Sequence, residues 1–235
     1  MLRRFTALRF RAEITSQEQL LEALSCDYEY IYAPARLLCS DLPEKNRIIA
    51  VPPAFRSESP HKLREIRDMG FTRVLAHTLG HIQAARESGM TIHGGFRLNI
   101  TNSIALNQYE KLGLTDTVLS IELNISRIKA IKAVIPAGII AYGRLPMMLL
   151  RRFPDYDGLT DRKNKFLPLV RNKGEAELLN PVPLILSDKI NDFSAVNFAV
   201  LRLTDEKPGE ILNGFKESIK PELICENFTR GLYYK

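Results

Sequence analysis

Short β-rich runs alternate with amphipathic helical stretches along most of the chain. The first run, residues 11–14, leads into the stretch TSQEQLLEAL, in which Thr15 or Ser16 is a typical helix N-cap residue. The eight runs that we interpret as strands are residues 11–14, 30–33, 47–51, 73–77, 91–99, 117–124, 138–144 and 198–204. Most of them are followed by a helical pattern, and eight units in this chain average about 29 residues each, a length that suits βαβ crossovers.

This rhythm predicts an α/β fold, a single closed (β/α)8 TIM-type barrel that spans residues 1–235. No G-x-G-x-x-G motif follows the first strand, so a dinucleotide-binding sheet is not favoured. Residues 145–190, between strands 7 and 8, break the rhythm. There FLPLV, RNKG and EAELL predict a β-hairpin insertion with its turn at Asn172, Lys173 and Gly174. Long insertions after barrel strands usually lie at the C-terminal face, over the site.

The composition is that of a globular protein and not of a disordered, membrane-spanning or disulfide-rich one. Hydrophobic residues make up 45% of the chain, which excludes intrinsic disorder, and no apolar run is long enough to cross a bilayer, so no membrane is expected as a partner. The first ten residues contain no apolar signal segment, and three cysteines are too few for a disulfide framework. We therefore expect a reduced, cytoplasmic protein.

The net charge of +6 permits attraction to nucleic acid, but the basic residues are dispersed. No lysine- and arginine-rich tract with interleaved aromatic residues occurs, so nucleic acid is a weakly supported partner and a solvated basic surface is the simpler interpretation.

Strand parity gathers polar side chains on the expected inner faces of the barrel, near the strand ends. The residues concerned are Glu13, His93, Arg97, Asn99, Glu122, Asn124, Arg144 and Arg202. Because unpaired buried charges are costly, these groups must either pair with one another or face a wet cavity. Two interpretations stay open: a structural salt-bridge network that closes the barrel, and a binding or catalytic site at its C-terminal face.

As a site, this set divides into two kinds of residue. The catalytic candidates are Glu122, His77 and His93, because a carboxylate or an imidazole can act as a general base. The substrate-binding candidates are Arg97, Asn99, Asn102, Asn124, Tyr142, Arg144, Asp161, Arg162 and Arg202. We expect Glu122, Arg144 and Arg202 to form one group, a carboxylate between two guanidiniums. Asn102 has a simpler alternative role as a helix cap.

Metal and nucleophile motifs are not supported. His77 and His81 are four residues apart but lack the glutamate of H-E-x-x-H, and they straddle a strand end and a helix start. No metal ligand set is assigned, and dependence on a divalent metal stays unknown. No G-x-S-x-G elbow is present.

Six blocks of sequence resemble, in order, the collagenase-like peptidases of family U32. They are AHTLGHIQAARESG, IHGGFRLNITNSIAL, LSIELN, YGRLPMM, LTDRKNKFLPL and FTRGLYY, in a resemblance that spans roughly residues 73–235. The resemblance implies a barrel with a peptidase function whose catalytic residues are not settled. Because relatives are often longer, it leaves open that the chain is a C-terminal barrel excised from a parent with further domains.

Some members of that family are hydroxylases that carry an iron–sulfur cluster held by four cysteines. Here Phe153 stands where a cysteine commonly precedes the proline, and NKGEAELLNP also lacks cysteine. Cys26, Cys39 and Cys225 lie elsewhere, so we expect no iron–sulfur cluster and no other cofactor.

Three functions remain. The first is a peptidase that hydrolyses peptide bonds at the polar C-terminal face and takes a peptide or protein substrate. The second is a non-catalytic accessory barrel that binds peptide or RNA, and the third is a cluster-less relative of the hydroxylases. The family resemblance favours the first.

Overall fold

The computed structural model describes residues 8–54, 60–151, 155–172 and 175–234. Its centre is a ring of eight parallel strands in the order β7-β13-β1-β2-β3-β4-β5-β6, closed because β6 also pairs with β7. The strands are β1 (Arg9–Glu13), β2 (Tyr30–Pro34), β3 (Ile48–Val51), β4 (Arg73–Ala76), β5 (Thr91–Gly94), β6 (Leu114–Val118), β7 (Ala137–Gly143) and β13 (Phe198–Arg202). The predicted closed (β/α)8 barrel is confirmed.

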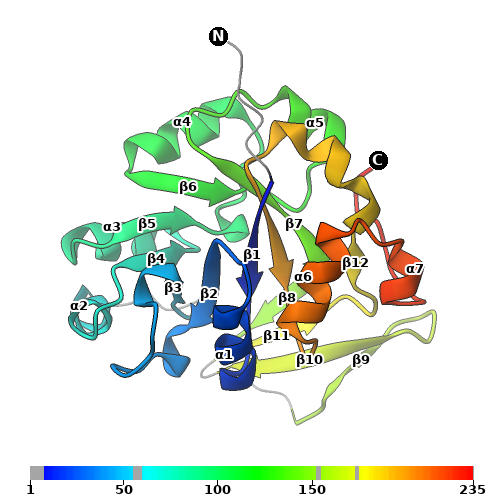
Figure 1. Cartoon of the computed structure of the whole chain (residues 1–235), viewed down its shortest axis with the longest axis horizontal. Coiled ribbons are helices and arrows are strands. Elements are labelled where there is room, and N and C mark those ends of the chain that lie inside the picture. The colour runs from blue at the N-terminus through cyan, green and yellow to red at the C-terminus, as the bar shows by residue number, and fades with distance from the viewer. Residues whose placement is uncertain (1–7, 55–59, 152–154, 173–174, 235) are drawn as a thin grey trace.

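Helices connect most of these strands and cover the outside of the barrel (Figure 1). The α-helices are α1 (Gln17–Ser25), α2 (Pro60–Asp68), α3 (Leu79–Glu87), α4 (Ser103–Lys111), α5 (Ile125–Ala130), α6 (Pro208–Lys216) and α7 (Pro221–Ile224). Four of them begin at an N-cap whose side chain accepts a backbone N–H three residues on: Ser16, Thr78, Asn102 and Asn124. The short 3-10 helices are η1 (Ala35–Leu37), η2 (Lys45–Arg47), η3 (Phe96–Leu98) and η4 (Ser187–Ala195).

The insertion between β7 and β13 forms a second, antiparallel sheet in the order β8-β11-β10-β9, called the insertion sheet here. Its strands are β8 (Pro146–Leu150), β9 (Gly158–Thr160), β10 (Phe166–Asn172) and β11 (Glu175–Leu179). The predicted hairpin is confirmed as β10 and β11, although Lys173, Gly174 and Phe153 lie outside the described residues. The short strand β12 (Leu184–Ile185) then pairs antiparallel with β7.

Barrel strands point toward the insertion sheet. In Figure 1 the arrowheads of β1 and β13 run down toward β9, β10 and β11, so this sheet lies at the C-terminal face of the barrel. It therefore lies at the end where (β/α)8 barrels place their sites.

Two strands differ from their expected bounds by more than two residues. The sixth strand is Leu114–Val118 rather than residues 117–124, and the fifth ends at Gly94 rather than at residue 99. After β6 the chain turns, with the N–H of Leu123 donating to the carbonyl of Ser120 at 3.3 Å. The alternation of apolar and polar residues after Val118 predicted a strand that does not form. Leu119 and its apolar neighbours are buried by other segments and not by packing within a sheet.

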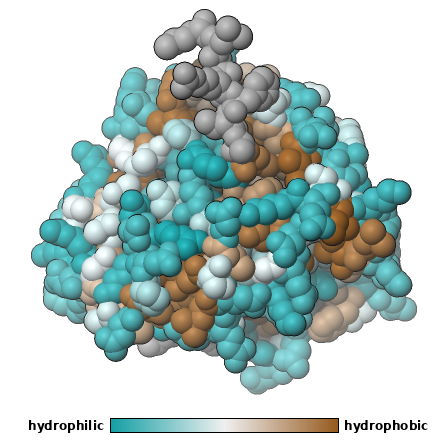
Figure 2. Space-filling model, in the orientation of Figure 1, coloured by the Kyte–Doolittle hydropathy of each residue, from teal (hydrophilic) through white to brown (hydrophobic). Residues whose placement is uncertain are grey.

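Most of the apolar side chains lie inside the fold. The face seen in Figure 2 is largely hydrophilic, with apolar residues in patches separated by polar ones. In the described parts of the chain, no helix is both long and apolar enough to cross a membrane.

The barrel interior contains a buried charged cluster around Arg11, whose side chain is 1% exposed. Its Nε donates to Glu29 Oε2 at 2.6 Å, and its Nη2 donates to Asp116 Oδ2 at 2.8 Å. The other oxygen of Asp116 lies 2.9 Å from Nδ1 of His93, and the guanidinium stacks on Phe198 with its Cζ 3.5 Å from the ring centroid. We call Arg11, Glu29, Asp116 and His93 the Arg11 network. It joins β1 to β6 across the barrel.

Asp116 stays ionised within this network. Burial raises the pKa of its carboxyl group, but the hydrogen bonds and charges of His93 and Arg11 outweigh burial and lower the pKa to about 2. The folded pKa is below the ordinary value of 3.8, so the group stabilises the fold above that value. This contribution is lost as the pH falls from about 3.8 toward 2.

Asp116→Asn is therefore expected to lower the free energy of unfolding at pH 7 by about 3 kcal/mol, because it leaves part of the Arg11 charge buried and uncompensated. Urea unfolding measures this, with the exposed Asp68→Asn on α2 as the control. The difference between Asp116→Asn and the wild type should shrink as the pH falls toward 2. A variant as stable as the wild type at pH 7 would show that the network does not stabilise the barrel.

Candidate functional site

A cavity of about 90 Å³ opens at the C-terminal face, between the barrel and the insertion sheet. The ends of β1, β2 and β3, the residue after β4, the segment after β5, the end of β13 and the hairpin of β10 and β11 all line it. We call it the mouth cavity. Since a water molecule needs about 10–15 Å³ of such space, it has room for several waters or a small part of a ligand.

Four charged side chains alternate in sign along one wall of the mouth cavity. Glu13 and Arg202 are in-register neighbours on β1 and β13, and Arg202 Nε donates to Glu13 Oε1 at 2.8 Å. Arg202 Nη2 also donates to Glu177 Oε2 at 2.5 Å, and the other oxygen of Glu177 accepts a hydrogen bond from Arg97. The order is Glu13, Arg202, Glu177, Arg97, and Glu177 comes from the insertion sheet.

The central pair of this row is held in its charged form. Burial raises the pKa of Glu177, but the charges and hydrogen bonds of Arg202 and Arg97 outweigh it and lower the pKa to about 2. Burial likewise lowers the pKa of Arg202, and the carboxylates of Glu13 and Glu177 more than reverse this. One carboxylate thus lies between two guanidiniums, but only Arg202 of the predicted group takes part, because Glu177 stands in place of Glu122 and Arg97 in place of Arg144.

His77 lines the mouth cavity beside this row. It is buried, and its Nδ1 has no hydrogen-bond partner among the described residues. Burial lowers the pKa of His77 to about 3, and the positive charge of Arg97 adds to the effect, so the imidazole is neutral near pH 7. Its backbone N–H donates to Nδ1 of His81 at 3.2 Å, which fixes the turn into α3.

The other predicted catalytic residues lie elsewhere. His93 is buried in the Arg11 network, and its Nε2 has no partner among the described residues. Glu122 was expected on an inner strand face, but it is exposed in the turn after β6 and does not line the mouth cavity. The expectation failed because β6 ends at Val118.

Three predicted binding asparagines have structural contacts. Asn102 and Asn124 are the N-caps of α4 and α5, where their side chains accept N–H groups of Ala105 and Arg127. The placement of Asn124 on an inner strand face is therefore wrong. Asn99 is exposed, lies after η3 with a left-handed φ of 51°, and accepts a hydrogen bond from Ser120 Oγ at 2.5 Å.

Tyr142 and Arg144 also differ from the parity prediction. The register between β7 and β13 shifts between Val200 and Leu201, so that Tyr142 pairs with Leu201. One extra residue reverses the faces of a strand, and Tyr142 consequently packs on Phe215 of α6 at a ring distance of 6.1 Å. Arg144 follows the end of β7 and donates to the backbone carbonyls of Asn180 and Pro181.

Asp161 and Arg162 are exposed in the turn between β9 and β10. One oxygen of Asp161 accepts the N–H groups of Lys163 and Lys165, at 2.7 and 2.9 Å, so this carboxylate shapes the turn. Neither residue lines the mouth cavity.

Of the predicted site residues, the structure brings His77, Arg97 and Arg202 together at the mouth cavity. Sequence reasoning missed Glu177. The hairpin pattern itself contained a signal, because Glu177 alternates with the apolar Ala176 and Leu178 of β11 and so faces away from the small apolar core of the insertion sheet.

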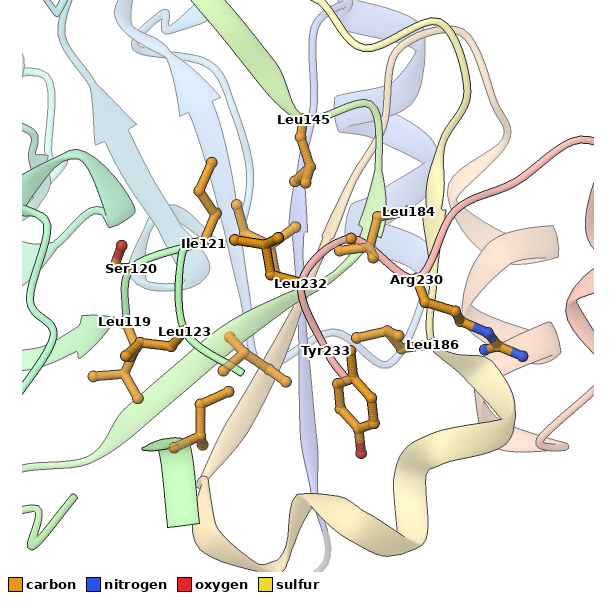
Figure 3. A pocket seen from close by; sticks show the side chains of 14 residues that line it. Leu119, Ser120, Ile121, Leu123, Leu145, Leu184, Leu186, Arg230, Leu232 and Tyr233 are labelled. Carbon is orange, nitrogen blue, oxygen red and sulfur yellow. The ribbon is translucent and has the colours of Figure 1, made fainter. Parts of the chain in front are cut away.

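A second cavity, of about 40 Å³, lies between the turn after β6, strand β7 and the C-terminal segment (Figure 3). Leucine side chains, among them Leu123, Leu145 and Leu232, gather around it, while the guanidinium of Arg230 points away. Arg230 pairs instead with Asp188. The cavity brings no catalytic group together, so we place the functional site at the mouth cavity.

Histidine, cysteine and carboxylate side chains are the groups that could bind a metal ion or a cluster. Within the described residues, no group of three or more histidine, cysteine, aspartate or glutamate side chains is arranged to hold a metal ion. The three cysteines are free, with Cys39 exposed and Cys26 and Cys225 partly buried. The expectation that no iron–sulfur cluster binds stays a prediction.

A sequence model of peptidase family U32 matches residues 53–152. The chain resembles this peptidase family. The match includes the first four of the six blocks noted in the sequence, together with His77 and Arg97, whereas Glu13, Glu177 and Arg202 lie outside it.

Solved structures share the fold. A structure described as the U32 peptidase Mk0906 aligns with a TM-score of 0.51 and 10% identity, over 88% of this chain and 97% of that chain. A thiamine phosphate pyrophosphorylase from Pyrococcus furiosus aligns with a TM-score of 0.50 and 10% identity, over 91% of this chain and 98% of that chain. No curated protein matches the sequence. At such identities the structural likeness shows the barrel fold alone.

Gly95 controls the position of His77. A Cβ atom at this residue would lie 2.4 Å from His77 Nδ1 and 2.7 Å from its Cε1, far closer than van der Waals contact. Gly95→Ala should displace the imidazole and lower the free energy of unfolding by about 1–3 kcal/mol, as overpacking does.

Urea unfolding and the NMR shift of the His77 ring measure the two effects. The control is Gly214→Ala on α6, where a new Cβ would lie 3.4 Å from Ile224 and should not destabilise the protein. If Gly95→Ala leaves both stability and the ring signal unchanged, the packing of His77 against Gly95 does not fix the imidazole.

Proposed function

We propose that the chain hydrolyses peptide bonds at the mouth cavity. The observation that carries the proposal is His77, a buried, neutral imidazole whose side chain lines a cavity at the C-terminal face of a U32-like barrel. Sites of (β/α)8 barrels lie at this face. The resemblance to a peptidase family supplies the reaction class.

The residues of the cavity suit the parts of such a reaction. A neutral imidazole can take a proton from a water molecule as its oxygen attacks the peptide carbonyl carbon. The C–N bond then breaks, and the departing amine takes up the proton. Arg97 and Arg202, which donate planar pairs of N–H groups, would orient the substrate.

A second candidate is a peptide-binding barrel without turnover. It is favoured by the pKa of about 3 for His77, because a general base works best with a pKa close to the working pH. It is also favoured because the guanidiniums of Arg97 and Arg202 are already hydrogen-bonded to carboxylates. Both candidates use the same cavity, and a cleavage assay separates them.

His77→Gln is expected to lower kcat for peptide cleavage by about 100-fold or more, the usual contribution of a general base. Mass spectrometry of a mixed peptide library measures cleavage. The matched control is His61→Gln, since the side chain of His61 on α2 is 78% exposed and should not affect the rate. Unchanged cleavage by His77→Gln would exclude His77 as the base.

The pH profile of the wild-type protein gives a second test of the role of His77. With a pKa of about 3, His77 stays unprotonated well below the usual titration range of histidine, so kcat/KM should not fall as the pH is lowered through 6.5. Peptide binding without cleavage at any pH would favour the second candidate.

A further inference from the structure

Glu177 makes an unusual contact for a residue of an inserted sheet. Its two carboxylate oxygens bind different arginines of the barrel, Oε1 that of Arg97 and Oε2 that of Arg202. Two guanidiniums converging on one carboxylate form the arrangement that proteins use to recognise carboxylate groups. The barrel therefore presents a ready-made carboxylate site, and the carboxylate in it belongs to the chain itself.

The insertion sheet has features of a unit that can move relative to the barrel. It has its own small apolar core of Leu169, Ala176 and Leu178, separate from the main core of the barrel. The chain enters and leaves it at one neck, where the N–H of Asn180 donates to the carbonyl of Leu145 at 2.8 Å. A shift at the neck would carry Glu177 away without unfolding the barrel.

A ligand group has space beside the arginines. Arg97, Arg202 and Glu177 all line the mouth cavity, and so does the neutral imidazole of His77. The cavity of about 90 Å³ therefore offers room for a small ligand group, such as a carboxylate, next to the two guanidiniums.

We propose that Arg97 and Arg202 form a binding site for a ligand carboxylate, which Glu177 fills in the free protein as an internal competitor. A ligand carboxylate that replaces Glu177 leaves both guanidiniums paired, so no buried charge is left uncompensated. The two carboxylates cannot share the site because like charges repel. If the ligand is a substrate, it belongs to the class of peptides with a carboxylate near the bound end, and this part of the inference rests on the proposed function. The carboxylate site itself needs no hydrolysis.

The experiment compares three acetylated peptides by isothermal titration calorimetry. One is tetra-alanine with a free C-terminal carboxylate, and one is the same peptide with a C-terminal amide. The third is amidated but has glutamate in place of the second alanine, so that its carboxylate is on a side chain. The proteins are the wild type, Glu177→Gln, Glu177→Ala and Arg202→Met, with the exposed Asp155→Asn in the same insertion as the control for net charge.

Glu177→Gln should bind a carboxylate peptide about tenfold or more tightly than the wild type, because the competing group is gone and a larger share of the protein is ready to bind. The amidated tetra-alanine should gain nothing. Arg202→Met should lose the preference for a carboxylate, and Asp155→Asn should bind as the wild type does. Preference for the first or the third peptide distinguishes a C-terminal from a side-chain carboxylate.

If Glu177 only holds the insertion sheet in place, its loss should weaken peptide binding or leave the affinity unchanged. That result overturns the proposal. Equal binding of the carboxylate and amide peptides by the wild type and Glu177→Gln overturns it as well. If neither Glu177 variant folds, by circular dichroism, the residue is scaffold and the competitor role is excluded. Carboxylate-selective binding without cleavage would refute the proposed hydrolysis alone, whereas His77-dependent cleavage without carboxylate selectivity would refute this inference alone.

Discussion

The buried guanidinium of Arg11 inside the barrel is the constraint on which much of the rest of this fold depends, because its positive charge must be balanced. Arg11 cannot lose its proton at any ordinary pH, so its charge must be balanced where it lies. The balance comes from Glu29 next to β1 and from Asp116 on β6, which is not a neighbour of β1 in the sheet. The aromatic ring of Phe198 on β13 supports the guanidinium from the third side. Arg11 thus connects β1 to β6, two strands that are not paired by backbone hydrogen bonds in the sheet.

Buried arginine charges must also be balanced toward the C-terminal face of the barrel, and there the balance involves the insertion sheet. Glu13 follows Arg11 on the same face of β1, and it pairs with Arg202. The positive charges of Arg202 and Arg97 require a second carboxylate for balance. Glu177 supplies it from the insertion sheet, which belongs to no barrel strand. Charge balance therefore holds the insertion sheet over the mouth cavity, and it also makes that contact replaceable by another carboxylate.

The family resemblance and the charged row cover different parts of the chain. The match to peptidase family U32 contributes His77 and Arg97, through β4 and the segment after β5. Glu13, Glu177 and Arg202 come from before and after it. The mouth cavity is thus assembled from both, and a comparison limited to residues 53–152 includes only Arg97 of the four charged residues in this row. The second cavity is lined mainly by leucine and isoleucine, and the C-terminal segment closes it against the turn after β6 and strand β7.

The sequence by itself determined the barrel, because eight β-rich runs with intervening helices allow few other closed arrangements. It also determined the hairpin insertion and the inward faces of Glu13 and Arg202, since regular strands alternate strictly. Tertiary structure alone decided where that alternation stops. The end of β6 at Val118 and the shifted register of β7 moved Glu122 and Tyr142 out of the site, because loop residues and a bulge follow packing and not parity. The partner of Arg97 and Arg202 was likewise a matter of tertiary structure: Glu177 is 80 residues from Arg97 along the chain, and no local pattern encodes a contact made by docking one sheet on another.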